Sequence, residues 1–328
     1  MRAVVTGGNG FVGRYIVEQL LARGDEVHVI GRRPYPELEA LGARCFQIDL
    51  ASEQPCDEAL KGCDAVFHVA AKAGLWGTWE DYFRNNVVAT QHILLQARRA
   101  GVAKFIYTSS PSVAIGKHDL EGADESTPYP ERYLAPYPHT KAMAERHVLS
   151  HGDILTVAIR PHLIWGPRDP HIIPRLVERA KAGRLPQIGD GTNKVDVTYV
   201  ENVADAHILA ADALCEGSPV NGKAYFIGQE QPVVLWDFVS EVLRRLGVEP
   251  PRRKINAKLA YAAAGVLETL HGAFNLQGEP LLTRLMVMQM THSHWFDHSA
   301  AQRDFGYGPR ISTEEGLQRL VAAWQSEH

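Results

Sequence analysis

Three regularly spaced glycines follow a short apolar run at the start of the chain. Residues 1–5 have the composition of a β-strand, residues 14–21 have helical spacing, and Gly7, Gly10 and Gly13 lie between them. A strand that turns tightly into a helix offers backbone N–H groups and the positive end of the helix dipole to a phosphate. Gly7 allows the turn, Gly10 lets the backbone approach a pyrophosphate, and Gly13 lets helix and strand pack closely. The pattern predicts dinucleotide binding rather than an ordinary strand–helix turn, with contacts from Gly7, Gly10, Phe11, Val12 and Gly13.

Strands and helices alternate through the first half of the chain. A long helical pattern covers 79–100. Short β-rich apolar runs occur at 27–30, 44–48, 65–69, 104–108 and 154–159. Such alternation predicts an α/β fold with a Rossmann-type doubly wound parallel sheet, whose ligands lie at the carboxyl ends of the strands. We expect residues 1–166 to form a nucleotide-binding domain, to which later segments return.

The pattern loosens in the second half. Short strand candidates at 195–199 and 224–227 mix with helical patterns at 203–214 and 235–246. A lobe built from discontinuous pieces has this appearance. We expect residues 167–328 to form mainly a small C-terminal substrate-binding lobe.

The segment 255–290 is unusually apolar. Its first part has an apolar helical face bracketed by Lys254, Lys258 and Glu268, so we expect it to lie on a surface rather than cross a bilayer. Its second part carries methionines, whose flexible side chains suit surfaces that adapt to varied ligands. A core helix with a subunit contact is one interpretation. An apolar lid, a membrane-facing patch or a partner interface are the others.

Tyr137 and Lys141 lie four residues apart in a run with helical spacing. Residues at this spacing share a helix face, so the phenol and the ammonium point into the same space. A tyrosine titrates near pH 10, but a neighbouring Lys⁺ and a helix N-terminus favour the phenolate and lower that pKa. Tyr137 is therefore our candidate proton donor to a carbonyl oxygen.

A serine follows the apolar strand that precedes this helix. Ser110 is expected at the carboxyl end of the strand, where its hydroxyl polarises the same oxygen. Ser109 is the alternative, and either serine could instead cap the strand end. The expected catalytic residues are Tyr137, Lys141 and Ser110.

The end of the second predicted strand indicates which dinucleotide binds. An NAD-specific site usually has an acidic residue there, which binds the ribose hydroxyls. This chain has Gly31 at that position, followed by Arg32 and Arg33. Guanidinium groups suit a 2′-phosphate, so we expect NADP(H) and reduction as the physiological direction. The alternative is a solvated loop with two arginines.

Together these motifs resemble the extended short-chain dehydrogenase/reductase superfamily over essentially the whole chain. The resemblance implies further cofactor contacts. Asp49 and Leu50 are similar to the adenine contact after the third strand, and the segment after the fourth strand is similar to the one that lies along the cofactor. Residues 160–167 resemble the segment beside the nicotinamide. The implied additional contacts are Asp49, Leu50, Ala70, Ala71, Lys72, Pro161 and Ile164.

Within the superfamily the sequence resembles the 3β-hydroxysteroid dehydrogenase-like branch. Residues 70–77 and 107–113, with the later motifs 291–296 and 303–307, are most similar to bacterial 2-alkyl-3-oxoalkanoate reductases of long-chain olefin biosynthesis. This likeness implies NADPH-dependent reduction of a 2-alkyl-3-oxoalkanoic acid to the 2-alkyl-3-hydroxyalkanoic acid. It also implies a role for the apolar segment 255–290, because two alkyl tails need a large surface from which water is excluded.

Several alternatives stay open. A 3β-hydroxysteroid or sterol-carboxylate dehydrogenase needs a similar apolar pocket and the same catalytic groups. A sugar-nucleotide epimerase is less consistent with an apolar second half. A non-catalytic NADP-binding regulator would not require both Tyr137 and Lys141. For the substrate carboxylate the candidates are Lys72, Arg168 and His162.

Composition and sequence motifs indicate which binding partners and which cellular location to expect. A net charge of −4 without a basic run gives no reason to expect nucleic acid. We expect no signal peptide, no metal despite His292, His294 and His298, and a cytoplasmic protein, which would be peripheral if segment 255–290 contacts a membrane. Helices 79–100 and 137–150 resemble the pair that forms a dimer interface in the superfamily, so a homodimer is expected. Association with olefin-pathway enzymes is a further hypothesis.

Overall fold

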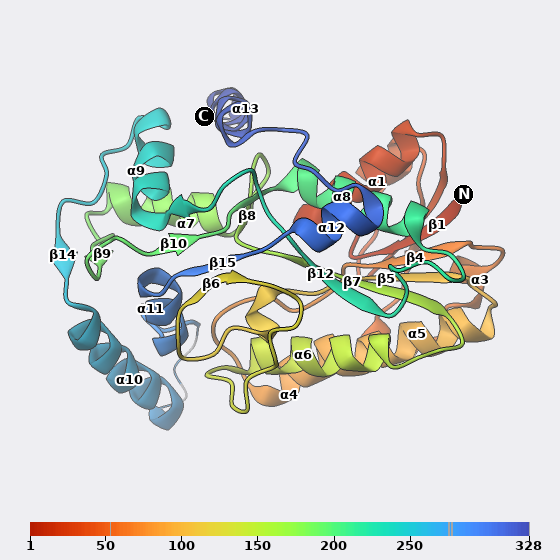
Figure 1. Cartoon of the computed structure of the whole chain (residues 1–328), viewed down its shortest axis with the longest axis horizontal. Coiled ribbons are helices and arrows are strands. Elements are labelled where there is room, and N and C mark those ends of the chain that lie inside the picture. Colours follow the sequence, from red (N-terminus) through yellow and green to blue (C-terminus); the bar gives the residue numbers. More distant parts are fainter. Residues whose placement is uncertain (53, 275, 277, 328) are drawn as a thin grey trace.

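A seven-stranded parallel sheet forms the centre of the molecule (Figure 1). The computed structural model describes residues 1–52, 54–274, 276 and 278–327. The strands are β1 (Arg2–Thr6), β2 (Glu26–Gly31), β3 (Arg44–Gln47), β4 (Ala65–His68), β5 (Lys104–Thr108), β7 (Leu155–Pro161) and β12 (Lys223–Ile227). The strand order is β12-β7-β5-β4-β1-β2-β3, so the chain adds β2 and β3 on one side of β1 and the later strands on the other. A doubly wound sheet opens a crevice for ligands where the connectivity reverses in this way, here between β1 and β4. The Rossmann-type prediction is therefore confirmed.

Helices cover both faces of the sheet because alternate strand residues point to opposite sides. In β1, Val5 belongs to the same core cluster as Ile16, and Val4 belongs to the cluster that contains Ile93. One face carries α1 (Phe11–Ala22), α8 (Val200–Ala213) and α12 (Ser299–Phe305). The other carries α3 (Asp57–Leu60), α5 (Ala89–Arg99) and α6 (Pro136–Leu149).

The helix predicted at 79–100 is continuous but not uniform. It consists of α4 (Trp79–Tyr82), a π-helical turn (Phe83–Val88) and α5. The wide turn brings the buried side chain of Asn86 to the loop after β4, where its amide oxygen accepts from the Lys72 N–H at 2.7 Å. Its amide nitrogen donates to the Thr140 hydroxyl at 3.1 Å. Such turns commonly serve a local contact of this kind.

The prediction of a single strand at 195–199 is wrong. It is divided into β10 (Lys194–Val195) and β11 (Thr198–Tyr199), which belong to different sheets. The buried Asp196 carboxylate between them accepts from the Phe296 N–H at 2.8 Å. This contact with a residue 100 positions away bends the chain.

The second half surrounds one end of the sheet with short elements (Figure 1). The first half also contains α2 (Pro36–Ala40) and β6 (Leu120–Ala123). The remaining elements of the second half are β8 (Ile164–Trp165), α7 (Ile172–Lys181), β9 (Gln187–Ile188), β13 (Val233–Val234), α9 (Leu235–Arg245), β14 (Lys254–Ile255), α10 (Ala257–Phe274), α11 (Arg284–Thr291), β15 (His294–Phe296) and α13 (Thr313–Glu327). A small sheet has the order β13-β10-β15-β6. α10 is exposed along most of its length, with Leu259 69% and Val266 60% exposed. Among the described helices none is both long and apolar enough to cross a membrane.

Candidate active site

The glycine loop between β1 and α1 has the geometry of an anion-binding turn. Gly7 has a φ of +68°, and a Cβ added to it would lie 2.9 Å from the Ala70 Cα. A Cβ on Gly13 would lie 2.2 Å from the Gly7 carbonyl oxygen, so only glycine lets α1 approach the loop this closely. Gly10 precedes α1 and gives it no side-chain cap, which leaves the first N–H groups of the helix available to a phosphate.

A cavity of about 550 Å³, which we call the nucleotide cavity, lies at the carboxyl ends of β1, β2 and β4. Tyr35, Asn85 and His171 also line it, although no sequence motif pointed to them. A Cβ on Gly31 would lie 2.2 Å from the Tyr35 hydroxyl, so the tyrosine occupies the space beside the strand end. Of the expected cofactor residues, the cavity is lined by Gly7, Arg32, Asp49, Leu50, Ala70, Ala71 and Lys72.

The other expected cofactor residues do not line this cavity. Val12, Gly13 and Pro161 are buried in the core, and Arg33 is exposed beside its neighbour Arg32. Gly10, Phe11 and Ile164 also lie outside the lining. Of the three glycines of the turn, only Gly7 therefore lines the cavity.

Tyr137 lies in the first turn of α6, next to the Ser110 side chain. Burial raises the pKa of Tyr137, and the hydrogen bond with Ser110 partly lowers it. Ser110 also accepts from the Ser112 N–H at 3.2 Å and lies 2.9 Å from the Ser112 hydroxyl oxygen. The buried Ser109 is directed toward Glu145 instead. Of the two serine candidates, Ser110 is therefore the one beside the phenol.

Lys141 lies one turn further along α6 and is buried. Its Nζ donates to the Thr108 carbonyl at 2.6 Å and lies 4.2 Å from the centre of the Tyr107 ring. Burial lowers the pKa of Lys141 to about 7, although the nearby Glu145 carboxylate opposes the shift. The pKa of Tyr137 is therefore raised by burial, where the sequence predicted that it would be lowered by Lys141.

A buried ion pair holds α6, the helix that contains Tyr137 and Lys141. The Glu145 carboxylate accepts from Arg160 Nε at 2.9 Å and Nη2 at 2.6 Å, and also from the Tyr129 hydroxyl at 2.6 Å. Burial alone would raise the pKa of Glu145, but the hydrogen bonds and charge of Arg160 lower it overall. The pair joins α6 to β7. Sequence reasoning missed it because nothing local links two residues 15 positions apart.

The three carboxylate candidates are all engaged elsewhere. Lys72 forms an ion pair with Asp81. Arg168 binds both oxygens of Glu18, at 2.6 and 2.8 Å. The buried His162 Nε2 lies 2.6 Å from His294 Nδ1. In this structure each of the three candidates therefore has a protein partner of its own.

The late histidines also have separate partners. His294 pairs with His162, His298 lies 3.0 Å from the Asp196 carboxylate, and His292 contacts Thr291 at 3.1 Å. In the part of the chain that the structure describes, no group of three or more His, Cys, Asp or Glu side chains could hold a metal ion.

A second cavity, of about 360 Å³, adjoins the nucleotide cavity. Ala73 and His171 line both. Two cations reach this second cavity: Arg175, paired with Glu279 at 3.0 Å, and Arg179, which donates to the Leu281 carbonyl at 3.4 Å. Its apolar lining, which defines what we call the apolar cavity, consists of Ala73, Leu75, Leu163, Ile172, Leu176, Leu185, Leu235, Trp236, Val239, Met286 and Met290.

This fold and this arrangement of serine, tyrosine and lysine define an extended short-chain oxidoreductase. The chain belongs to the 3-beta hydroxysteroid dehydrogenase/isomerase family, whose model matches residues 4–258. It is an oxidoreductase, and membership of this enzyme family decides against a non-catalytic regulator.

Individual relatives match over nearly the whole chain. The chain is 44% identical to a 2-alkyl-3-oxoalkanoate reductase of Stenotrophomonas maltophilia (strain K279a), over 98% of this chain and 99% of the relative. It is 37% identical to the decarboxylating sterol-4-alpha-carboxylate 3-dehydrogenase of Homo sapiens, over 99% and 88%. Among solved structures, the complex of the Thermus thermophilus UDP-glucose 4-epimerase with NAD is 26% identical, with a TM-score of 0.74 and all of both chains covered.

Proposed function

We propose that the chain is an NADPH-dependent reductase that converts a 2-alkyl-3-oxoalkanoic acid into the 2-alkyl-3-hydroxyalkanoic acid. The observation that carries this proposal is the placement of Ser110 beside Tyr137, with the buried Lys141 one turn further along α6, in a molecule whose nucleotide cavity adjoins an apolar cavity. The name of the relative in Stenotrophomonas maltophilia supports the same reaction.

The chain's own residues supply the proton and orient the ketone. Ser110 and Tyr137 donate to the ketone oxygen, and Tyr137 transfers its proton as negative charge develops there. The raised pKa keeps the phenol protonated at neutral pH, which is the form that reduction needs. NADPH, when bound, supplies the hydride to the 3-oxo carbon. Lys141, fixed by the Thr108 carbonyl, holds the cofactor ribose.

The glycine turn and the nucleotide cavity fit a dinucleotide. The added Cβ atoms at Gly7 and Gly13 would fill space that the turn needs, and Asp49 lies on the same cavity for the adenosine. Arg32 lines that cavity beside Gly31, the position at which an NAD-specific site usually has an acidic residue, and its guanidinium suits a 2′-phosphate. We therefore propose NADP(H) rather than NAD(H). Following the resemblance, the reaction belongs to long-chain olefin biosynthesis, where other enzymes of the pathway are candidate partners.

A sterol-carboxylate or 3β-hydroxysteroid dehydrogenase is the second candidate function. The apolar cavity and the human relative favour it, because a flat ring system also needs a dry surface. The same catalytic residues would run the reaction in the oxidative direction.

A spectrophotometric assay separates the two candidates. Purified protein is incubated with NADP⁺ and a long-chain 2-alkyl-3-hydroxyalkanoic acid, and in parallel with a 3β-hydroxysteroid. The oxidative direction avoids a 3-oxo acid, which decarboxylates spontaneously. We expect NADPH to form with the branched hydroxy acid, and the reaction to be far slower with NAD⁺. Turnover of the steroid alone would refute the proposed substrate, and equal rates with NAD⁺ would refute the cofactor preference.

A further inference from the structure

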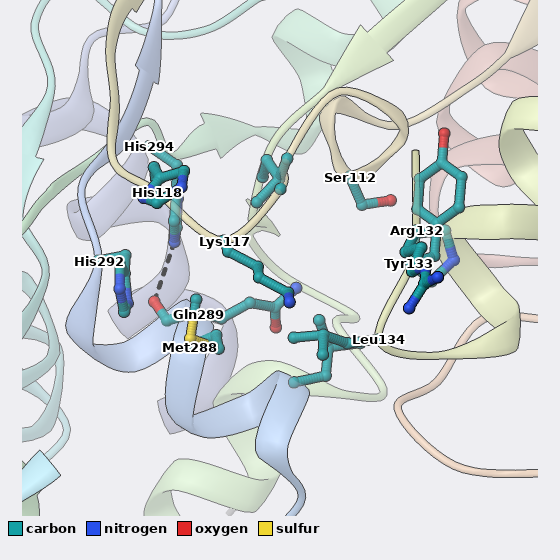
Figure 2. A pocket seen from close by; sticks show the side chains of 14 residues that line it. Ser112, Lys117, His118, Arg132, Tyr133, Leu134, Met288, Gln289, His292 and His294 are labelled. Atoms are coloured by element: carbon teal, nitrogen blue, oxygen red, sulfur yellow. Dashed lines mark hydrogen bonds between the residues drawn. The ribbon is translucent and has the colours of Figure 1, made fainter. Parts of the chain in front are cut away.

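A third cavity lies beside Ser112, the neighbour of Ser110, and its lining includes Lys117 and Arg132 (Figure 2). Its volume of about 20 Å³ has room for one small polar group but not for an alkyl chain. None of the residues that line it is acidic. The lining, which defines the head-group cavity, is Ser112, Ile115, Gly116, Lys117, His118, Arg132, Tyr133, Leu134, Pro138, Leu285, Met288, Gln289, His292 and His294.

This cavity is close to the reacting groups. Ser112 lines it and lies 2.9 Å from the Ser110 hydroxyl oxygen, and Ser110 lies beside Tyr137. Pro138, the residue after the catalytic tyrosine, also lines it. A ligand group here is therefore a near neighbour of a ketone held by Ser110 and Tyr137.

The head-group cavity and the apolar cavity are separated by α11. Gln289 lines both of them, with Met286 on the apolar side and Met288 on the other (Figure 2 shows Met288 and Gln289). The helix thus has the large apolar cavity on one side and the small head-group cavity, with Lys117 and Arg132, on the other.

Two of the cations at the head-group cavity are not neutralised. Lys117 lies in the loop before β6 and Arg132 in the loop before α6, and neither has a carboxylate partner among the residues that the structure describes. Other cations around the site are engaged. Examples are the pairs Lys72–Asp81, Arg160–Glu145, Arg168–Glu18 and Arg175–Glu279.

We propose that the head-group cavity binds the carboxylate of the substrate, and that Lys117 and Arg132 make the enzyme specific for a free acid. The inference rests on the proposed reduction of a 3-oxo acid. In such a substrate the carboxylate carbon is two bonds from the ketone carbon, so the groups that hold the two must be adjacent, as Ser110 and Ser112 are. Arginine and lysine form charge-assisted hydrogen bonds with carboxylates. The alkyl tails then extend into the apolar cavity.

The test compares the acid with its methyl ester. KM and kcat are measured with NADP⁺ for a long-chain 2-alkyl-3-hydroxyalkanoic acid and for its ester, using wild-type protein, Lys117→Met, Arg132→Met and the double variant. A hydrogen bond to a charged group contributes about 1.5–3 kcal/mol, so each substitution should raise KM for the acid roughly 10-fold or more. KM for the ester and kcat for both compounds should change little. Lys61→Met, at an exposed lysine outside both cavities, is the matched control.

Two results would overturn the proposal. One is an equal effect on acid and ester. The other is a loss of acid preference in Arg179→Met but not in the Lys117 and Arg132 variants, which would assign the carboxylate to the apolar cavity instead. Binding of a long-chain 2-alkyl carboxylic acid and of the matching alcohol, followed by thermal shift, needs no turnover. If the wild type prefers the acid and the double variant does not, the carboxylate site stands even when the proposed reaction fails. If the wild type has no such preference, the site is refuted.

Discussion

At the scale of single residues, the proposed reaction depends on the phenol of Tyr137. This side chain lies beside Ser110, and its ring lies 6.2 Å from that of Tyr82, centre to centre. Tyr137→Phe keeps the ring contact and removes the transferable proton. We expect kcat to fall by about 10²–10⁴-fold, the usual contribution of a positioned acid. NADPH binding, followed by its fluorescence, should change little. Turnover within a few-fold of wild type would contradict the role given to Tyr137.

Two adjacent arginines provide a matched test of cofactor preference. Arg32 lines the nucleotide cavity and Arg33 does not. A lost charge-assisted hydrogen bond costs about 1.5–3 kcal/mol, so Arg32→Ala should raise KM for NADPH roughly 10- to 100-fold and leave KM for NADH nearly unchanged. Arg33→Ala should have the smaller effect. The assignment of Arg32 to a 2′-phosphate would not survive equal losses with NADPH and NADH.

At the scale of elements, a buried histidine joins β4 to its neighbours. His68 Nδ1 lies 2.7 Å from the Thr6 hydroxyl oxygen of β1, and Nε2 lies 2.8 Å from that of Thr90 in α5. Burial lowers the pKa of His68 to about 3, with a smaller contribution from the charge of Lys141. The histidine is therefore neutral in the folded protein at neutral pH.

This low pKa predicts acid sensitivity. Below about pH 6.5 the unfolded chain takes up a proton at this histidine that the folded protein refuses. The stability present above pH 6.5 is thus lost as pH falls toward 3, by about 2 kcal/mol at pH 5 for His68 alone. Melting temperatures of wild type and His68→Gln at pH 7.5 and 5 measure this. The variant should be less stable at pH 7.5 but lose less on acidification, whereas the exposed control His118→Gln should follow wild type. An unchanged pH dependence in His68→Gln would show that His68 is not the group responsible.

Local sequence patterns predicted most of the helices and strands, and the features that they missed depend on contacts between residues far apart in the chain. The glycine turn, the parallel strands and the Tyr137/Lys141 spacing depend on neighbours in sequence, so they could be predicted. The π-helical turn around Asn86 and the break at Asp196 depend on partners such as Thr140 and Phe296. The contact of the carboxylate candidate Arg168 with Glu18 could not be predicted for the same reason, because the two are 150 residues apart. No sequence motif pointed to Lys117 and Arg132, which the fold brings to one cavity.

At the scale of the whole molecule, the outer surface of α5 and α6 is the expected dimer interface. The two helices lie side by side on one face of the sheet (Figure 1). Leu95 of α5 is 39% exposed there. Leu209 of α8, on the opposite face, has a similar exposure of 36% and serves as a matched control.

Placing a charge at each leucine tests which face associates. Burying an unpaired carboxylate in an interface is costly, so Leu95→Glu should separate the subunits and Leu209→Glu should not. Light scattering after size exclusion should give twice the chain mass of 36.3 kDa for wild type and Leu209→Glu, and the single mass for Leu95→Glu. Both leucines are partly solvated in the isolated chain, so neither variant should lose more than about 0.5 kcal/mol of its own folding stability. A wild-type mass of one chain would refute the dimer. Dissociation by Leu209→Glu alone would move the interface to the α1–α8 face, on the side of the sheet away from the catalytic helix.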